Sequence, residues 1–337
     1  MVPLLKPKVS ILITTKNGEK TIESCLSSVL ANSDSYEVIV IDDSVDRTRE
    51  IVSRYPVILI HAPDKNTAQK NNVGLEHASG DIIAFTDQDC IVPADWITKG
   101  CKYFDDEKIG AVGGPNLTRI EAPLHERCAG YVLGSRIGSG PSFSRYAIIG
   151  GEGEYREVDE SELISCNLFC RRTALAQAGM FDQTLDSCEE NAVLYEMKRV
   201  GFKLLHIPTL YVWHHRRPLF KPFMRQIMWY AHGRACLIKR EWRSLKPVYA
   251  LPSVLVLALL TGPLLSLISR FLLFLYASAV ILYLLLCACA SIDVVFGQKA
   301  EMKAIPVLVV GFPLIHIAYG LGFLHGLLGR RYRYLPT

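Results

Sequence analysis

The first ninety residues alternate between short apolar runs and segments with helical spacing, and this alternation limits the folds open to the chain. Four runs are typical of strands, at residues 9–14, 37–41, 57–60 and 81–86. The segments between them have apolar residues at helical spacing, at residues 18–30, 46–55 and 67–78. Continuous apolar strands that alternate with helices predict an α/β domain with a mostly parallel sheet covered on both faces.

The fourth apolar run ends in Asp87 and Asp89, which are separated by one residue. In an extended segment, side chains two positions apart point to the same side, so the two carboxylates face one ligand together. Oxygen ligands suit Mg²⁺ or Mn²⁺, which predicts a divalent cation that carries a diphosphate. An acid-rich turn after a strand is the alternative. Such sheets bind ligands at the carboxyl ends of their strands, where Asn17 and Asp43 also fall.

The composition excludes several other kinds of protein. Net charge is only +4 in 337 residues, and no long basic tract indicates nucleic acid binding. The ten cysteines have no metal-binding spacing, so we expect buried thiols in a reducing compartment. The N-terminus has no signal peptide pattern. Half of the residues are hydrophobic, and this excess is concentrated after Lys246.

Residues 214–246 carry nine Lys and Arg but one acid, Glu241, and their apolar residues recur at helical spacing. With Trp229 and Trp242 nearby, this pattern predicts a basic amphipathic helix at a membrane surface. An ordinary solvated surface helix is the alternative.

Three apolar runs follow, at residues 248–269, 271–291 and 304–328. The first two have the length of a helix that spans a bilayer. The third contains Pro306, Pro313 and several glycines, so a re-entrant or interfacial segment is the alternative to a span. The basic block before Val248 places the N-terminal domain in the cytoplasm by the positive-inside rule. The arginines at 330, 331 and 333 do not fit a C-terminus outside, so the orientation of that end stays open.

Four short motifs occur in the first ninety residues. Residues 13–17 are Ile-Thr-Thr-Lys-Asn, and residues 40–44 are Val-Ile-Asp-Asp-Ser. Residues 70–81 begin with Lys-Asn-Asn-Val-Gly-Leu and end with Ser-Gly-Asp, and residues 86–89 are Thr-Asp-Gln-Asp. In this order the motifs resemble those of family 2 glycosyltransferases with the GT-A fold, which is Rossmann-like. Members of this family transfer a sugar from a nucleotide-diphosphate donor with inversion.

The resemblance implies a role for each acid. Asp43, together with Asp42, would hydrogen-bond the base or ribose of the nucleotide, although a capped turn is the alternative. Lys70 would face the donor phosphates, although alone it is typical of a surface charge. Asp89 would hold the Mg²⁺ or Mn²⁺ bound to the diphosphate, and Asp87 would contact the sugar, the metal or its waters.

A second block resembles the acceptor side of the same family. The segment around Asn167 resembles the one that leads into the acceptor site, which implies that Asn167 binds substrate. Glu189 and Glu190 stand where members have Glu-Asp, so Glu190 would be the general base and Glu189 would bind substrate. A helix N-terminus with favourable acids is the alternative. The pattern departs at Ala192, where an acid often stands, and at Glu196, where Arg is common.

Two further segments have expected roles. His214 or His215 follows the last core strand, where a histidine completes the metal site of several GT-A enzymes; a structural histidine is the alternative. Residues 133–162 are rich in Gly and predict a long mobile loop, which in an enzyme is often a lid.

The C-terminal region resembles exopolysaccharide glycosyltransferases of the succinoglycan type at residues 228–235 and 316–323. The Gln-x-x-Arg-Trp signature of processive synthases is absent from the sequence, which argues against polymerisation by this chain alone. We therefore expect a GT-A domain at residues 1–213, an interfacial segment at 214–246 and a membrane region at 247–329.

The expected reaction is metal-dependent, inverting transfer of one sugar from a nucleotide-diphosphate sugar to a lipid-linked saccharide at the cytoplasmic face. A polyprenyl phosphate acceptor is the nearest alternative. A non-catalytic membrane scaffold or nucleotide-sugar sensor is an alternative of another class. A nucleotidyltransferase of similar fold would need a glycine-rich basic loop after the first strand, and residues 14–20 lack one.

Overall fold

The computed structural model describes residues 8–32 and 36–329, and the chain divides into two compact units. One unit comprises Met1–Leu117 and Ser144–His215, and the other comprises Thr118–Phe143 and Arg216–Thr337. The arginines at 330, 331 and 333, which leave the C-terminal orientation open in the sequence, lie outside the described residues.

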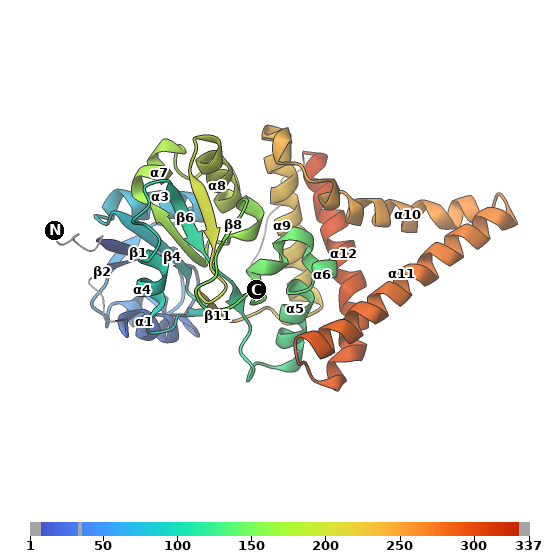
Figure 1. Cartoon of the computed structure of the whole chain (residues 1–337), viewed down its shortest axis with the longest axis horizontal. Coiled ribbons are helices and arrows are strands. Elements are labelled where there is room, and N and C mark those ends of the chain that lie inside the picture. The colour runs from blue at the N-terminus through green and yellow to red at the C-terminus, as the bar shows by residue number, and fades with distance from the viewer. Residues whose placement is uncertain (1–7, 33–35, 330–337) are drawn as a thin grey trace. The chain divides into compact units, whose positions relative to one another are not determined.

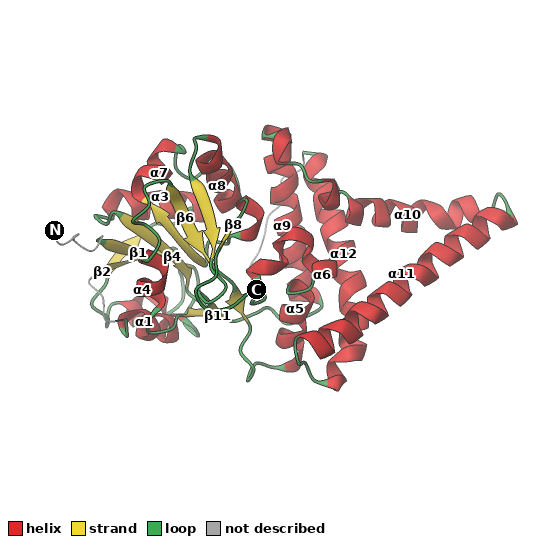
Figure 2. Cartoon of the chain, viewed as in Figure 1, coloured by secondary structure: helices red, strands yellow, loops and turns green. Residues whose placement is uncertain are grey.

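The first unit is built on an eight-stranded sheet with the order β3-β2-β1-β4-β9-β6-β10-β8 (Figures 1 and 2). Its strands are β1 (Val9–Thr15), β2 (Tyr36–Asp42), β3 (Ile58–His61), β4 (Ile82–Asp87), β6 (Ile109–Gly113), β8 (Arg156–Glu157), β9 (Asn167–Arg171) and β10 (Lys203–His206). Strands β3, β2, β1 and β4 are parallel to one another, and β10 is parallel to β6, whereas β9 and β8 run antiparallel to their neighbours. The predicted mostly parallel sheet is therefore confirmed.

Helices cover both faces of this sheet, as the alternating sequence pattern predicts (Figure 1). One face packs against α1 (Ile22–Leu30), α2 (Thr48–Val52) and α4 (Trp96–Cys101), and the other packs against α3 (Thr67–His77), α7 (Arg172–Gln177) and α8 (Glu189–Arg199). In β1, Ile11 and Ile13 pack on the face that α1 covers, and Leu12 packs on the face that α3 covers. Successive side chains of a strand point to opposite faces of the sheet.

A second, three-stranded sheet is formed by short segments from distant parts of the chain. Its central strand β11 (Val212–His214) runs antiparallel to β5 (Cys90–Ile91) and parallel to β7 (Asn116–Leu117). In this register His214 lies opposite Cys90, the residue that follows Asp89. The small sheet therefore brings His214 to the end of β4.

The Gly-rich stretch at residues 133–162 is more regular than the sequence predicts. It contains the end of α5 (Leu124–Leu133), α6 (Arg136–Ser139), the 3₁₀ helices η1 (Gly140–Arg145) and η2 (Glu160–Glu162), and β8. Gly140 adopts a φ of 53°, a conformation that side chains with a Cβ rarely take, and it joins α6 to η1. The expectation of a single irregular loop is therefore wrong, because short turns with local hydrogen bonds fill the segment.

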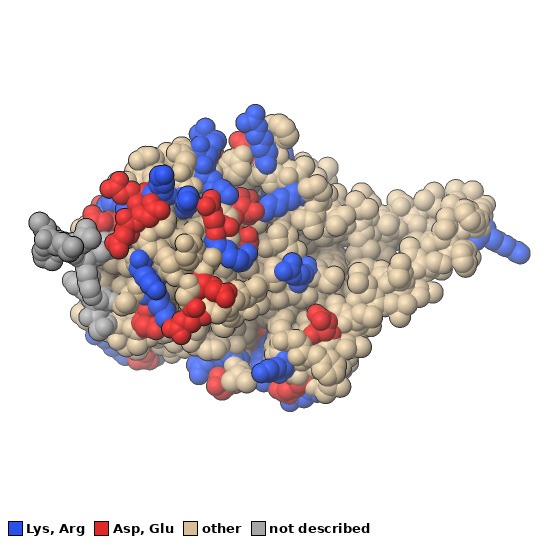
Figure 3. Space-filling view, viewed as in Figure 1, with Lys and Arg blue, Asp and Glu red and all other residues tan. Residues whose placement is uncertain are grey.

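The second unit is helical. Three of its helical segments have the length and hydropathy to cross a membrane: Pro247–Ser266, Arg270–Gly297 and Met302–Leu327, which contain α10 (Leu251–Ser266), α11 (Arg270–Gly297) and α12 (Ile305–Leu327). The view in Figure 3 shows α10 and α11 as a surface with almost no charged side chains. The third segment is a continuous helix through Pro313 and has the length of a full span.

The basic segment after β11 forms α9 (Lys221–Arg240), and its apolar face packs against α12. Gly322 and Gly326 of α12 lie against the backbone of Met228 and His232, an approach that any larger residue would block. Lys239 and Arg240 at the end of α9 are exposed, as is Trp242. The helix expected from the sequence is present, but most of its apolar surface is already covered by protein.

Candidate active site

The carboxyl ends of β1, β2 and β4 carry the polar residues that the motifs single out. Gln88, just after β4, accepts hydrogen bonds from the Thr15 hydroxyl and from the Lys16 backbone N–H (2.9 Å), and its Nε2 donates to the Lys16 carbonyl (3.2 Å). Asn17 accepts a bond from the backbone of Val45 (3.0 Å). These contacts join the loops at the strand ends into one wall of a site.

Asp43 is held at this wall as a charged carboxylate. It accepts hydrogen bonds from Lys16 Nζ (2.7 Å) and from the Asp64 backbone N–H (3.0 Å). Burial alone would raise the pKa of Asp43, but these hydrogen bonds and the charge of Lys70 outweigh it and hold the pKa below its ordinary value. An ionised Asp43 fits the expected contact with hydroxyl or N–H donors of a nucleotide.

Asp42 has a different environment. It is fully buried, and it accepts hydrogen bonds from the Ser44 backbone N–H (3.0 Å) and hydroxyl (2.6 Å), with Arg49 Nε 3.5 Å away. Asp42 therefore caps a turn, as the alternative interpretation predicts. Asp43 instead faces the loops that carry Lys16 and Asp64.

Lys70 points from α3 toward the strand ends. Its side chain is buried, and Nζ donates to the Thr15 carbonyl (3.0 Å). Burial lowers the pKa of Lys70, Asp43 opposes that change, and Lys16 reinforces it. The alternative of a solvated surface charge is wrong, because the ammonium lies inside the site.

Asp87, Asp89 and His214 form a cluster with the chemistry of a metal site. One ligand atom from each lies within 4.8 Å of the others, and His214 Nε2 is 3.5 Å from an Asp89 carboxylate oxygen. Two ligands about 2.1 Å from one ion are at most about 4.2 Å apart, so small side-chain rotations suffice for coordination. Two carboxylates and one imidazole suit Mn²⁺ or Mg²⁺. Of the two candidate histidines, His214 joins the cluster and His215 is exposed.

His214 also lies beside a second set of donors, Cys90 and Cys166, whose sulfur atoms are within 4.8 Å of one another and of the imidazole. Both thiols are buried. Burial, followed by the contact with Cys166, raises the pKa of the Cys90 thiol well above its ordinary value. Mn²⁺ and Mg²⁺ prefer oxygen ligands to sulfur, so the carboxylate set is the better site for either cation.

The first turn of α8 supplies two more carboxylates. Cys188, with a φ of 62°, turns the chain into the helix, and Glu189 and Glu190 follow. Burial, together with the charges of Glu190 and Asp87, raises the pKa of Glu189 well above its ordinary value. Glu190 instead faces Arg145, whose Nη1 lies 3.5 Å from its carboxylate.

Asn167, which the resemblance places at the acceptor site, makes its hydrogen bonds inside the domain. It is fully buried at the start of β9, its amide donates to the Pro115 (3.1 Å) and Leu210 (2.6 Å) carbonyls, and its oxygen accepts from Trp96 Nε1 (2.8 Å). These bonds use the side chain inside the domain, so Asn167 supports the strands near the site and has no exposed atom for a ligand.

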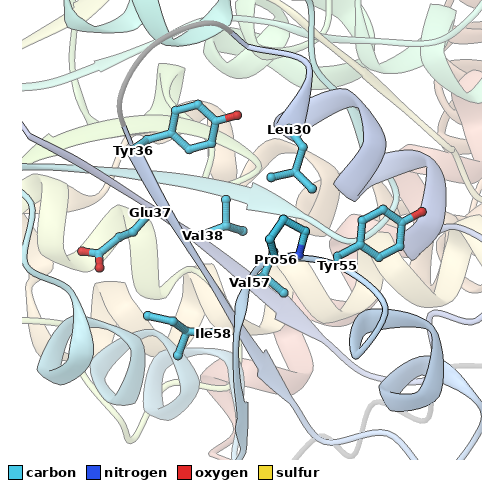
Figure 4. Close-up of a pocket in the computed structure, with 8 residues that line it drawn as sticks. All are labelled: Leu30, Tyr36, Glu37, Val38, Tyr55, Pro56, Val57 and Ile58. Carbon is cyan, nitrogen blue, oxygen red and sulfur yellow. The ribbon is translucent and has the colours of Figure 1, made fainter.

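A cavity of about 420 Å³ lies elsewhere in the same unit (Figure 4). Its lining comes from the end of α1, the start of β2, the segment before β3 and the first residue of β3: Leu30, Tyr36, Glu37, Val38, Tyr55, Pro56, Val57 and Ile58. Because β2 begins at Tyr36 and ends at Asp42, this cavity is at the opposite end of the strand from the polar cluster.

Residues 10–159 match the family described as Glycosyl transferase family 2. The glycosyltransferase AglE from Haloferax volcanii is 32% identical over 118 residues, which are 32% of this chain and 39% of AglE. This chain thus covers well under half of that relative's length.

A longer match links 95% of this chain with 97% of a protein from Methanococcus voltae at 21% identity. That protein is the dolichyl N-acetyl-alpha-D-glucosaminyl phosphate 3-beta-D-2,3-diacetamido-2,3-dideoxy-beta-D-glucuronosyltransferase. Among solved structures, the mannosyltransferase PcManGT from Pyrobaculum calidifontis in complex with GDP-Man and Mn²⁺ superposes with a TM-score of 0.59 at 17% identity. The superposition covers 98% of this chain and 89% of PcManGT.

The sheet order, the helices on both faces and this structural likeness define a GT-A fold. Residues 10–159 of the chain thus match the Glycosyl transferase family 2 domain, its relatives are named as glycosyltransferases, and three helices among the described residues are long and apolar enough to fit a membrane anchor.

Proposed function

We propose that this protein transfers a sugar, with inversion, from a nucleotide-diphosphate sugar to a hydroxyl of a lipid-linked saccharide at the cytoplasmic membrane face. The observation that carries the proposal is the cluster of Asp87, Asp89 and His214 at the end of β4, beside Asp43 and Lys70 on the neighbouring elements. The clustered carboxylates suit a cation that binds the diphosphate, the buried ammonium of Lys70 suits the phosphate charge, and the ionised Asp43 suits the donors of the nucleoside.

On the donor side, Asp43 accepts hydrogen bonds from the ribose or base, and Asp42 keeps the turn that carries it in place. Lys70 faces the diphosphate, whose negative charge favours the ammonium form of this buried amine. Asp89, Asp87 and His214 would hold Mn²⁺ or Mg²⁺, with Asp89 as the principal ligand and Asp87 also near the sugar. The cation supplies positive charge that stabilises the departing nucleoside diphosphate.

On the acceptor side, Glu190 takes the proton from the attacking hydroxyl, and Glu189 contacts the acceptor or donor sugar. Inversion needs a base on the side of the sugar opposite the leaving group, and a carboxylate at a helix start is stabilised as an anion until the proton arrives. Glu190 is one methylene longer than the aspartate that the family resemblance implies, which adds reach without changing the chemistry.

Membrane attachment supports a lipid-linked acceptor. Three segments are apolar and long enough to span, and basic residues precede the first of them, which favours a cytoplasmic catalytic unit. The relative from Methanococcus voltae is named for transfer to a dolichyl-linked sugar phosphate. A water-soluble donor and a membrane-bound acceptor would then meet at the headgroup plane.

The proposal is tested with purified protein in detergent or nanodiscs, a panel of nucleotide-diphosphate sugars and a membrane lipid extract. We expect nucleoside diphosphate release with one donor that requires Mn²⁺ or Mg²⁺, is stimulated by the extract and is lost in Asp89→Ala. Absence of metal-dependent transfer and hydrolysis with every donor would favour a scaffold or sensor.

The Glu190→Gln variant separates the two acceptor classes. A hydroxyl needs a base, so transfer to a lipid-linked saccharide should fall about 100-fold or more. A lipid phosphate is already an anion, and near wild-type turnover by this variant would indicate a polyprenyl phosphate acceptor instead.

A further inference from the structure

Arg145, at the last position of η1, is buried next to the proposed catalytic base. Its Nη1 lies 3.5 Å from Glu190 Oε1, and the side chains are 9% and 10% exposed. Its Nη2 donates to the Glu160 carbonyl (3.0 Å), whereas Nε is buried without a hydrogen-bond partner among the described residues. The guanidinium is therefore anchored at one corner and retains a free donor beside the ion pair.

The backbone around Arg145 is fixed from several sides. The carbonyl of Ser144 lies 2.9 Å from His206 Nε2, and the Ser144 hydroxyl donates to Glu162 (3.0 Å). Burial lowers the pKa of His206, which favours a neutral imidazole with its Nε2 proton on that carbonyl. Asn191, the residue after Glu190, donates to the same Glu160 carbonyl as Arg145 does (2.6 Å). The Glu160 carbonyl therefore binds both the Arg145 guanidinium and Asn191 in the first turn of α8, and so holds the two close together.

The charge balance shows why a cation is needed here. Glu189 and Glu190 are adjacent, and Glu189 also feels the negative charges of Asp87 and Asp186. Within the described part of the chain, Arg145 is the one basic residue that pairs with Glu190. Without Arg145, two adjacent buried carboxylates would have no ion-pair partner among the described residues, and burial of an unpaired charge is costly.

We propose that Arg145 is a positioning residue for the transfer reaction, which orients the Glu190 carboxylate toward the acceptor hydroxyl. The inference rests on the proposed function and adds a residue to it. The contact with Arg145 involves Glu190 Oε1, so Oε2 is left for the incoming hydroxyl. The guanidinium does not touch the reacting atoms and acts through Glu190.

The test is a double-mutant cycle with Arg145→Gln, Glu190→Gln and the double variant, assayed for kcat and KM with the lipid-linked acceptor. We expect Arg145→Gln to lower kcat about tenfold or more, less than Glu190→Gln, which should remove about 100- to 10,000-fold. The double variant should match Glu190→Gln alone, since Arg145 has nothing left to position. The donor KM should stay within about twofold in all three.

Two further variants separate positioning from folding. Arg145→Lys keeps a cation and should recover part of the kcat lost in Arg145→Gln. Arg199→Gln is the matched control, because it removes an arginine from an ion pair with Glu196 on the same helix, where Arg199 is 62% exposed. It should retain wild-type kcat. Nucleoside diphosphate binding by calorimetry shows that each variant is folded.

Three results would overturn the inference: wild-type kcat in Arg145→Gln, a Lys variant no better than Gln, or losses that multiply in the double variant. Failure of the proposed function gives a different pattern, in which the wild-type protein itself transfers no sugar to a hydroxyl acceptor.

Discussion

Replacement of His214 by Ala gives a quantitative test of the cation site. His214 supplies one of three clustered donor groups, and its imidazole Nε2 is 3.5 Å from Asp89. Loss of a group that binds or orients at a metal site typically weakens affinity by up to about 100-fold, which is about 2.7 kcal/mol. We expect Mn²⁺ to bind His214→Ala about 100-fold more weakly in the presence of nucleoside diphosphate, with much of the activity recovered at high Mn²⁺.

The neighbouring histidine is a matched control for this experiment. His215 is exposed and does not belong to the cluster, so His215→Ala should bind Mn²⁺ like the wild-type protein. Cys166→Ser should also leave Mn²⁺ binding unchanged, because the buried thiols form the other donor set. Binding is measured by the electron paramagnetic resonance signal of free Mn²⁺. Equal Mn²⁺ affinity in His214→Ala and His215→Ala would refute the assignment of His214.

Three further predictions address the residues around this site. Lys70→Met should weaken nucleoside diphosphate binding about tenfold or more in calorimetry, because a buried charge that faces phosphate is lost; unchanged affinity would exclude that contact. Glu189→Gln should raise the melting temperature near pH 8. The pKa of Glu189 is raised in the folded state, so the protonated side chain stabilises the fold fully below the ordinary pKa of 4.5. This stabilisation is lost as the pH rises through the folded-state pKa, and Gln, which carries no charge, avoids that loss. The gain should shrink toward acidic pH, and a gain independent of pH would contradict this cause. Asn167→Ala should lower the free energy of unfolding by about 1–3 kcal/mol, because buried hydrogen-bonding groups lose their partner. The folded fraction should keep the wild-type donor KM. A raised KM with normal stability would instead indicate that Asn167 contacts the substrate.

Much of the proposed donor site could be predicted because its residues follow strands that are continuous in sequence. Asp43 and Asp89 come directly after apolar runs, and the topology of a parallel sheet brings such positions to one edge. Lys70 belongs to a helix between two of those strands, so its direction follows from the same pattern. Local hydrophobic periodicity therefore predicts the sheet, its helices and the convergence of these residues at one edge.

The remaining contacts depend on pairings that are distant in sequence. His214 reaches Asp89 because the three-residue strand β11 pairs with the two-residue strand β5, and such short strands have no hydrophobic period to detect. Arg145 lies in a 3₁₀ helix within a Gly-rich segment, where spacing predicts no direction for a side chain. The burial of Asn167 is equally hard to predict, because a polar residue in a motif is as typical of a ligand contact as of a buried bond to the backbone.

The membrane region illustrates a related limit. The three apolar segments are evident from length and composition alone. The packing of α9 against α12 instead depends on Gly322 and Gly326, whose lack of a side chain permits close approach of two backbones. Glycines inside an apolar run carry no hydrophobic signal that distinguishes a packed face from a lipid-facing one.

The most direct test of the account is sugar transfer in reconstituted nanodiscs with a labelled nucleotide-diphosphate sugar and lipid-linked acceptors. We expect label in the lipid fraction only when Mn²⁺ or Mg²⁺ is present, with loss in Asp89→Ala and in Glu190→Gln. Label that enters the lipid fraction equally well in Asp89→Ala, or without a divalent cation, would contradict it.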